Sequence, residues 1–349
     1  MLITTDYPPD TGGVAWYYGN LVEKLNTTSS HTSPPIFGGG AVHVLKLGTW
    51  AMTRWWPFMI FPLLNSTLLS RPYSWWVGQV LPVGTVVWLL SFVWRKPYIV
   101  STHGMDVLLP LQSLRKRWLV GKILSRAYLI TANSKWTKEE IIRNYESGIT
   151  NQELRKKIEV VYPIPKPKRE VPPDEVHALR KKLNIADEAK VLLTVARLVK
   201  RKGIDRVITA LPELWKKLPN VYYIVVGEGE ERGALQHHTH TILTPLSHGR
   251  EIVGHENQVI LAGRARDEEL PAYYAMADLF IQLPRSLDGD VEGFGIVYLE
   301  ANQYELPIVA TASGGTREAL TLCKQVTLIG NPDDSSEVSA AILHALSNQ

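Results

Sequence analysis

The sequence predicts an α/β protein with two doubly wound parallel-sheet domains that face a central cleft. Short apolar segments of strand length alternate with helical segments, and this alternation is typical of parallel sheets joined by crossover helices. A proline-rich segment interrupts the alternation near the middle of the 349 residues, which are enough for two domains. We therefore expect a first domain over residues 1–165, an extended linker over 166–180 and a second domain over 181–349.

The first domain is expected to begin with a strand over residues 1–5, which prolines end. A loop containing Gly12 and Gly13 follows, and Val14 to Leu25 has the pattern of a helix. Glycines before a helix let backbone amides face a ligand, although a plain turn has the same composition. The remaining strands of this domain are expected at 41–47, near 75, and at 98–102, 127–132 and 158–162.

Tryptophan is concentrated in the first domain, since nine of the eleven tryptophans lie before residue 120. The 20 residues from Trp75 to Trp94 carry no charge and are long enough to span a bilayer. We favour a buried strand, a turn around Pro82 and an apolar helix, because proline and glycine in the middle of the segment mark a turn. For the aromatic segment 50–60, a core helix, a membrane-interface helix and an apolar acceptor groove all remain open.

The second domain repeats the alternation, and its first strand leads into a basic turn. Arg197 and Lys202 lie in this turn, between the strand and the next helix. Cations at the carboxyl end of a parallel strand are well placed for a diphosphate, whereas an exposed basic turn would only meet water. The strands of this domain are expected at 190–196, 221–226, 258–262, 278–283, 307–310 and 325–329.

Two glutamates, Glu292 and Glu300, flank the start of a helix that should open near Gly295. They could hold two hydroxyl-bearing parts of one ligand, while the exposed amides of the helix start bind an anion between them. Glutamates that merely face water are the alternative. In the first domain, His103 ends a buried strand, where open α/β sheets bind ligands, although a lone histidine there is often structural.

The order of these motifs resembles the donor-site signature of retaining nucleotide-sugar glycosyltransferases of family 4, which have the GT-B fold of two Rossmann-like domains. The resemblance extends over nearly the whole chain. One departure lies at residues 302–306, where the family often has Ala-x-Gly before the proline. The ordered pieces of the signature are Glu292, Gly293-Phe294-Gly295, Leu299-Glu300-Ala301, Pro307-Ile308-Val309 and Gly314-Gly315.

The resemblance implies transfer of a hexosyl group from a nucleoside diphosphate sugar to an acceptor hydroxyl, lipid-linked or on a glycan, with retained anomeric configuration. The first domain would lie on the acceptor side, and the second would bind the donor without a metal or another cofactor. Arg197 and Lys202 would stabilise the leaving diphosphate. Glu292 would hold sugar hydroxyls, and His103 would orient the sugar. The further substrate-binding residues would be Gly12, Gly13, Gly227, Arg264, Phe294, Gly295, Glu300, Gly314 and Gly315.

Two other interpretations remain open: another GT-B enzyme, such as a sugar-nucleotide epimerase, and a sugar-nucleotide binding protein without activity. The formal charge of +4 is too small to indicate a nucleic-acid partner and is compatible with an anionic membrane or substrate. The single cysteine, Cys323, cannot form an internal disulfide, so we expect a cytoplasmic protein. Contact of the Trp-rich first domain with the cytoplasmic face of a membrane is left open.

Two further expectations concern the second domain. Five histidines lie in the segment 236–257, and we expect an exposed insertion rather than a metal site, because cysteine and carboxylate partners at metal spacing are missing. Members of the family usually end in a helix that crosses back to the first domain. Since the sequence stops at Gln349, we expect either that this crossover helix is missing or that the chain is truncated.

Overall fold

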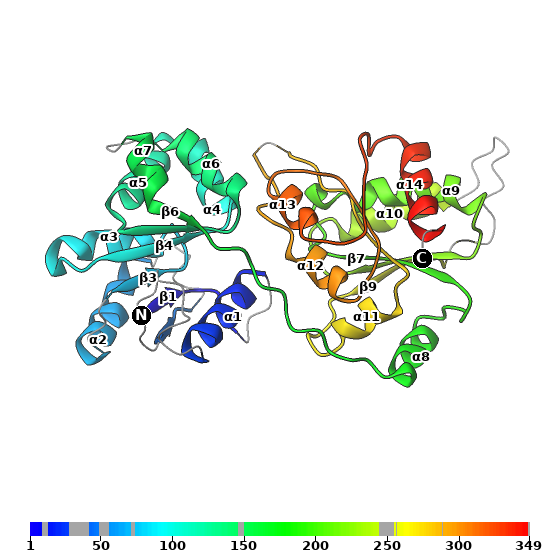
Figure 1. Cartoon of the computed structure of the whole chain (residues 1–349), viewed down its shortest axis with the longest axis horizontal. Helices are drawn as coiled ribbons and strands as arrows, with labels where there is room; N and C mark the ends of the chain where they lie inside the picture. The colour runs from blue at the N-terminus through cyan, green and yellow to red at the C-terminus, as the bar shows by residue number, and fades with distance from the viewer. Residues whose placement is uncertain are drawn as a thin grey trace. The chain divides into compact units, whose positions relative to one another are not determined.

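The chain divides into two compact units, Met1–Lys166 and Pro167–Gln349, and each has its own parallel sheet (Figure 1). The alternation of strands and helices in the sequence therefore predicted the α/β class correctly. The computed structural model describes residues 1–8, 13–27, 42–48, 56–70, 74–145, 150–243, 255, 257–287 and 289–347.

The sheet of the first unit has the strand order β2-β1-β3-β4-β5-β6, and every neighbouring pair is parallel. In this order β1 and β4 flank β3, and because all three are parallel, the loops after them leave the same edge of the sheet. The strands are β1 (Leu2–Thr4), β2 (Val44–Lys46), β3 (Trp75–Val77), β4 (Tyr98–Thr102), β5 (Leu129–Ala132) and β6 (Ile158–Val160).

Helices cover both faces of this sheet, because alternate strand residues point to opposite sides. Ile99 faces α1 (Gly13–Thr27), whereas Tyr98 and Val100 share a core with α3 (Val83–Trp94) and α5 (Leu114–Arg126). The remaining helices of the unit are η3 (Trp56–Met59), α2 (Ile60–Ser70), α4 (Met105–Leu108), η4 (Leu109–Gln112), α6 (Lys135–Asn144) and α7 (Asn151–Lys157).

The uncharged segment 75–94 forms the buried strand β3 and the helix α3, with a turn between them, as the proline and glycine predicted. Trp76 donates a hydrogen bond from Nε1 to Ser101 Oγ at 2.7 Å, so its polar atom is satisfied inside the core. Within the described ranges, we find no helix with the length and apolar character needed to cross a bilayer. In the aromatic segment 50–60, Met59 is buried in the core, and residues 50–55 lie outside the described ranges.

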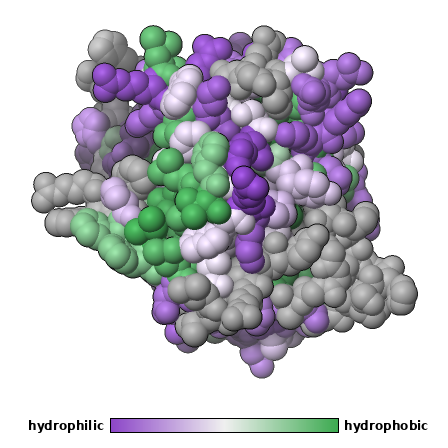
Figure 2. Space-filling view, turned by 90° about the vertical axis from the view of Figure 1, so that its left-hand side faces the viewer, coloured by the Kyte–Doolittle hydropathy of each residue, from purple (hydrophilic) through white to green (hydrophobic). Residues whose placement is uncertain are grey.

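Large apolar side chains are also exposed on the first unit, on η3, α2 and α3. Figure 2 shows apolar side chains gathered on this end of the unit, beside hydrophilic ones. The rings of Phe58 and Phe61 stack on one another, with centroids 6.2 Å apart. We call the exposed side chains of Phe58, Phe61, Leu89, Phe92 and Val93 the apolar band.

The sheet of the second unit has the order β12-β11-β10-β7-β8-β9, again with parallel neighbours. The strand order reverses direction between β7 and β10, which is where open α/β sheets bind ligands. The strands are β7 (Lys190–Val195), β8 (Val221–Val226), β9 (Val259–Gly263), β10 (Leu279–Gln282), β11 (Ile308–Ala310) and β12 (Val326–Leu328).

One face of this sheet shares its core with α9 (Ile204–Trp215), α10 (Arg232–Leu243) and α14 (Ser335–Ser347). Figure 1 shows α8 and α11 on the opposite side. The remaining helices are α8 (Pro173–Lys182), η5 (Lys200–Lys202), α11 (Leu270–Met276), α12 (Ile296–Gln303) and α13 (Thr316–Thr321).

The extended connection is shorter than the expected linker over 166–180, because α8 begins at Pro173. Proline at the first helical position and acidic residues in the first turn, Asp174 and Glu175, favour a helix start here. The preceding chain is also tied to the second unit: Tyr304 Oη lies 3.3 Å from the backbone nitrogen and 3.1 Å from the backbone oxygen of Arg169.

Candidate active site

The loop after β7 places basic side chains at the carboxyl edge of the second sheet. At its end, Gly203 has φ +69, and a Cβ atom there would lie 1.9 Å from the backbone oxygen of Leu283. Only glycine allows this close approach, which holds the loop against the end of β10. Arg201 and Lys202, just before this glycine, are consequently only 4% and 8% exposed.

Arg201, Lys202 and Glu292 form a largely buried charge cluster beside this loop, and the half-exposed Asp290 borders it. Lys202 Nζ lies 2.6 Å from Glu292 Oε2, and Arg201 Nη1 contacts the same carboxylate. Arg201 Nε also lies 2.8 Å from Asp290 Oδ1. The two buried cations are thus balanced by the largely buried Glu292 and by the half-exposed Asp290.

The protonation of this cluster is set by burial and by the neighbouring charges. Burial would raise the pKa of Glu292, but Lys202 and Arg201 outweigh it and hold the pKa below its ordinary value. The pKa of Lys202 is lowered by burial, against the attraction of Glu292, and Arg197 contributes to the lowering. Arg197 itself is exposed. Glu292 is therefore ionised at neutral pH, with the positive charge of Arg201 against it.

The structure thus brings together Lys202 and Glu292, which are 90 residues apart in sequence. It also places the charge of Arg197 close enough to lower the pKa of Lys202. Arg201 was not among the residues predicted for the site. Its position directly before Lys202 was a possible signal, but a run of basic residues does not reveal which member turns inward.

The glycine loop before α13 packs on the backbone of Glu292. The Gly315 amide donates a hydrogen bond to the Glu292 carbonyl at 2.8 Å, and a Cβ on Gly314, at φ +58, would lie 2.4 Å from Val291 Cγ1. Gly314 and Gly315 were predicted to bind substrate. The Gly315 amide is bonded to the Glu292 carbonyl, so this loop packs on the backbone beside the charge cluster.

The helix α12 begins at Ile296, directly after Gly295, as the sequence predicted. Phe294 was expected to line the substrate site, but its side chain is 2% exposed and lies in the interior. Glu300, on α12, accepts a hydrogen bond from the Tyr274 hydroxyl at 2.8 Å. The Tyr274 ring in turn stacks on Tyr304, with centroids 5.5 Å apart. Because Tyr274 lies on α11, this helix holds the Glu300 carboxylate in position.

The remaining predicted residues of this unit follow β8 and β9. Gly227 comes directly after β8, and its amide donates to the Gly263 carbonyl at 2.8 Å. Arg264 comes directly after β9 and is exposed. Because β7, β8 and β9 are parallel neighbours, these loops and the one carrying Lys202 leave the same edge of the sheet.

His103 follows β4 in the first unit and packs against the rings of Tyr17 and Tyr18. Its Nε2 lies 2.7 Å from the Tyr18 hydroxyl, and burial lowers its pKa to about 4. Its backbone amide donates to Asp106 Oδ1 at 2.8 Å. Burial raises the pKa of Asp106 to about 7, although backbone amides counteract the shift. Gly13 is the first residue of α1, and Gly12 lies outside the described ranges.

The histidine-rich segment has two parts in the structure. His238, on α10, lies with its Nε2 2.9 Å from Thr209 Oγ1, and the ring of His255 stacks on Trp215 with centroids 4.5 Å apart. His248 lies outside the described ranges. Among the residues that are described, no three histidine, cysteine or acidic side chains gather as metal ligands do.

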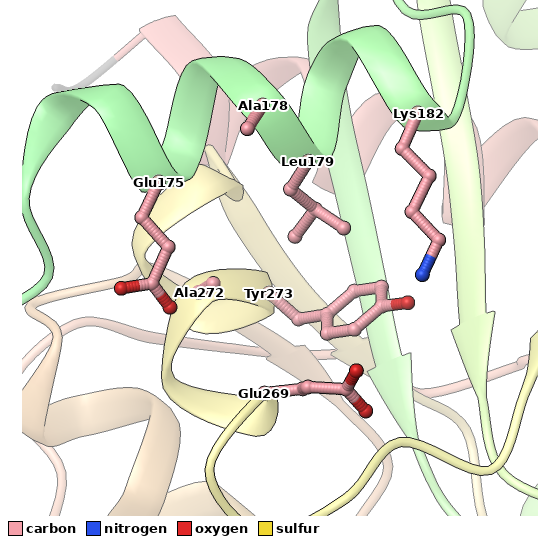
Figure 3. A pocket seen from close by; sticks show the side chains of 7 residues that line it. All are labelled: Glu175, Ala178, Leu179, Lys182, Glu269, Ala272 and Tyr273. Atoms are coloured by element: carbon pink, nitrogen blue, oxygen red, sulfur yellow. The ribbon is translucent and has the colours of Figure 1, made fainter.

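A separate pocket of about 190 Å³ lies between α8 and α11 (Figure 3). Its walls combine an apolar floor with charged groups at the sides, and it contains none of the predicted site residues. It is therefore distinct from the charge cluster. The lining residues are Glu175, Ala178, Leu179, Lys182, Glu269, Ala272 and Tyr273.

Comparison with known proteins links this geometry to a family. A family model described as "Glycosyl transferases group 1" matches residues 175–349, the part of the chain that holds the charge cluster. The GDP-mannose-dependent alpha-(1-6)-phosphatidylinositol monomannoside mannosyltransferase of Mycolicibacterium smegmatis is 28% identical over 95% of this chain and 85% of its own length. The GDP-mannose-dependent monoacylated alpha-(1-6)-phosphatidylinositol monomannoside mannosyltransferase of Corynebacterium glutamicum is 27% identical over 96% and 85%.

Among solved structures, Anabaena Alr3699/HepE in complex with UDP and glucose superposes with a TM-score of 0.65. It is 19% identical, and the match covers 99% of this chain and 94% of that one. This likeness shows the two-domain GT-B fold.

Proposed function

The chain belongs to the glycosyl transferases group 1 and is a hexosyltransferase, and on this premise we propose that it transfers mannose from GDP-mannose to a mannosylated phosphatidylinositol. One observation carries the proposal. The similarity to the two mannosyltransferases covers 95% and 96% of the chain, so it includes the first unit as well as the second. Similarity limited to the second unit, which is proposed to bind the donor, would not favour a particular acceptor.

The charge cluster supports this proposal from the donor side. During transfer the bond between the anomeric carbon and the diphosphate oxygen breaks, and the leaving GDP gains negative charge. Arg197 and Lys202 would stabilise that charge, with Arg201 behind them, while Glu292 would hold hydroxyls of the sugar. By analogy with the loss of one oxyanion donor, Lys202→Met should slow transfer by about 10²–10³-fold.

We further propose that the anomeric configuration is retained. The acceptor oxygen bonds to the anomeric carbon as the diphosphate oxygen leaves, and the acceptor proton passes to the leaving diphosphate. GDP-mannose is an α-linked donor, so the product would be an α-mannoside. The one-bond carbon–proton coupling of the new anomeric position distinguishes the two anomers, and a β product would overturn retention.

A direct assay tests donor and acceptor together. The purified chain is incubated with GDP-mannose and phosphatidylinositol monomannoside in mixed micelles, and the lipid is examined by mass spectrometry for one added hexose. UDP-glucose in place of GDP-mannose, and phosphatidylinositol without mannose, serve as controls. Equal or faster transfer from UDP-glucose would overturn the donor assignment, and transfer only to a water-soluble glycan would overturn the acceptor.

We propose that the reaction needs no divalent metal. Arginine and lysine side chains would supply the charge that Mg²⁺ supplies to diphosphates in other enzymes. Activity in the presence of EDTA should therefore equal activity in added Mg²⁺. Loss of activity in EDTA, restored by Mg²⁺, would contradict this proposal.

A lipid acceptor requires access to a membrane, and we propose that the first unit makes peripheral contact with its cytoplasmic face. On α5, Leu114 and Trp118 are 83% and 54% exposed, and the residues between them in sequence, 115–117, are exposed cations. The helix lies beside α3, since the Arg126 guanidinium lies 4.0 Å from the centroid of the Phe92 ring. Exposed apolar rings next to cations suit the interface of an anionic bilayer.

Vesicle flotation tests this contact. We expect the chain to float with vesicles containing phosphatidylinositol and to remain behind with phosphatidylcholine alone, because each cation near an anionic surface is worth about 1 kcal/mol. Trp118→Ser combined with Lys116→Glu should weaken flotation. Leu322→Ser, at an exposed leucine of the second unit, is the matched control. Equal flotation of the double variant and the control would contradict membrane contact through α5.

A further inference from the structure

The hydroxyl of Tyr18 lies between a backbone carbonyl and the imidazole of His103. Tyr18 is on α1 and is 0% exposed. Its oxygen lies 2.6 Å from the Gly78 carbonyl oxygen and 2.7 Å from His103 Nε2. A carbonyl oxygen can only accept, so the hydroxyl proton must point to Gly78. The phenolic oxygen is then left to accept, and His103 must donate from Nε2–H.

The surroundings of His103 keep its ring neutral and fixed in orientation. Burial lowers the pKa of His103 to about 4 and raises the pKa of Tyr18 well above its ordinary value, so neither group changes charge near neutral pH. The rings of Tyr17 and Tyr18 meet the imidazole edge-on, with centroids 5.1 and 5.4 Å away. The nearby carboxyl of Asp106 bonds the backbone amide of His103, and not its ring.

A neutral imidazole that carries its proton on Nε2 has an acceptor lone pair on Nδ1. Among the residues that the structure describes, none forms a hydrogen bond with His103 Nδ1. The ring therefore offers one unused polar atom, and that atom can accept a hydrogen bond but cannot donate one.

We propose that Tyr18 is a positioning residue for glycosyl transfer: it commits His103 to the Nε2–H tautomer, so that Nδ1 accepts a hydrogen bond from a substrate hydroxyl. This inference rests on the proposed function for the presence of the hydroxyl-bearing substrate. It excludes His103 as a proton donor, because the Nε2 proton is directed at Tyr18.

Nuclear magnetic resonance of the full chain tests the tautomer without any assay of activity. In long-range ¹H–¹⁵N spectra at neutral pH, the signals that disappear in His103→Gln identify His103. We expect the Nε2–H pattern in the wild type and a mixture of tautomers in Tyr18→Phe. Tyr98→Phe is the matched control, because its buried hydroxyl donates to the Ile123 carbonyl at 2.7 Å in the same unit. An Nδ1–H pattern in the wild type, or no change in Tyr18→Phe, would overturn the proposal.

Kinetics test whether the tautomer matters for transfer. Tyr18→Phe should lower kcat by up to about 10²-fold, because a misplaced group near the reacting atoms has effects of this size. Tyr98→Phe should leave kcat within about twofold, as a change outside the site. If Tyr18 acts through His103, the double variant Tyr18→Phe/His103→Gln should be no slower than His103→Gln alone. If the loss of kcat in the double variant equals the product of the losses in the two single variants, Tyr18 acts independently of His103.

The two experiments separate this inference from the proposed function. If another sugar nucleotide or acceptor is the substrate, the spectra still report the tautomer of His103 in each variant. A correct tautomer combined with unaltered kcat in Tyr18→Phe, measured with the true substrate, would refute the positioning role alone.

Discussion

Arg201 and Lys202 carry two positive charges into the interior of the second unit, where each would be costly without a partner. Glu292 contacts both of them, and Asp290 reaches Arg201 at 2.8 Å. Removing one member leaves a buried charge unbalanced, whereas removing one partner from a surface pair leaves a charge in water. Arg201, Lys202 and Glu292 therefore depend on one another for stability, and this requirement is separate from binding a diphosphate.

Replacing Arg201 with methionine should destabilise the second unit by about 3–5 kcal/mol, the range for breaking a buried pair. Arg266→Met is the control, because Arg266 pairs with Glu269 at 3.1 Å on the surface of the same unit. It should change stability by less than about 1 kcal/mol. Urea unfolding measures both values, and similar losses in the two variants would contradict the importance of burial.

His103 should make the stability of the first unit depend on pH. Its pKa is about 4 in the fold and 6.5 ordinarily, so the unfolded chain binds more protons between these values. The contribution of the neutral ring to the stability of the first unit is present above pH 6.5 and is lost as pH falls to 4. Asp106, with its pKa raised to about 7, has the opposite effect on stability. Between pH 3.8 and 7 the folded state binds more protons than the unfolded chain, so the contribution of Asp106 to stability falls as pH rises.

The His103→Gln variant isolates the histidine part of this dependence. Relative to the wild type, it should gain on the order of 2 kcal/mol of stability as pH falls from 6.5 to 4, because glutamine does not titrate. Urea unfolding at several pH values gives this difference. A difference that stays constant with pH would show that the histidine is protonated equally in both states.

Loops, rather than strands and helices, bring the site together in the second unit. The loop after β7 meets the end of β10 at Gly203, and the loop before α13 meets the backbone of Glu292 through Gly314 and Gly315. In both places two backbones approach too closely for a side chain. The positions of the charged groups therefore depend on glycines at these close approaches.

Gly203→Ala should disturb the site from this position. The new Cβ would lie 1.9 Å from the Leu283 carbonyl oxygen, and φ +69 is unfavourable for alanine, so the loop must shift. We expect a loss of about 1–3 kcal/mol of stability and weaker binding of GDP in calorimetry. Gly233→Ala, on α10 with nothing within 4 Å, is the control and should be neutral or stabilising by up to about 1 kcal/mol. Unchanged GDP binding in Gly203→Ala would contradict this account.

Each of the two units has the components of an independent domain: a parallel sheet, helices on both of its faces and a core of its own. The charge cluster, Glu300 and the loops after β7, β8 and β9 all belong to Pro167–Gln349. His103 and the apolar band belong to Met1–Lys166. The proposed donor chemistry and the proposed lipid contact therefore lie in different units.

Residues 167–349 expressed alone should therefore unfold in one cooperative transition and bind GDP. Differential scanning calorimetry measures the transition, and titration calorimetry measures the affinity, with Lys202→Met in the same fragment as the control for site-specific binding. A fragment that folds but has lost GDP binding would show that the first unit is required for the nucleotide site. A fragment without a cooperative transition would contradict the assignment of an independent core.

Most of the fold could be predicted from the sequence because its signals are local. Apolar segments of strand length, the turn at Pro82 and the helix start at Gly295 each depend on neighbouring residues, and the ordered motifs from Glu292 to Gly315 identified the family. The start of α8 inside the expected linker was missed, although Pro173 and the acidic residues after it are a local signal for it.

The contacts that shape the site could not be predicted, because they join residues far apart in the chain. Arg201 meets Glu292 across 91 positions, and Tyr18 meets His103 across 85. The hydrophobic pattern of the sequence does not predict that the side chains of Arg201 and Phe294 are buried. It also does not predict that the Gly315 amide bonds the Glu292 carbonyl. Packing of the sheet edges decides these directions, since it determines which polar groups lose water and must find partners among themselves.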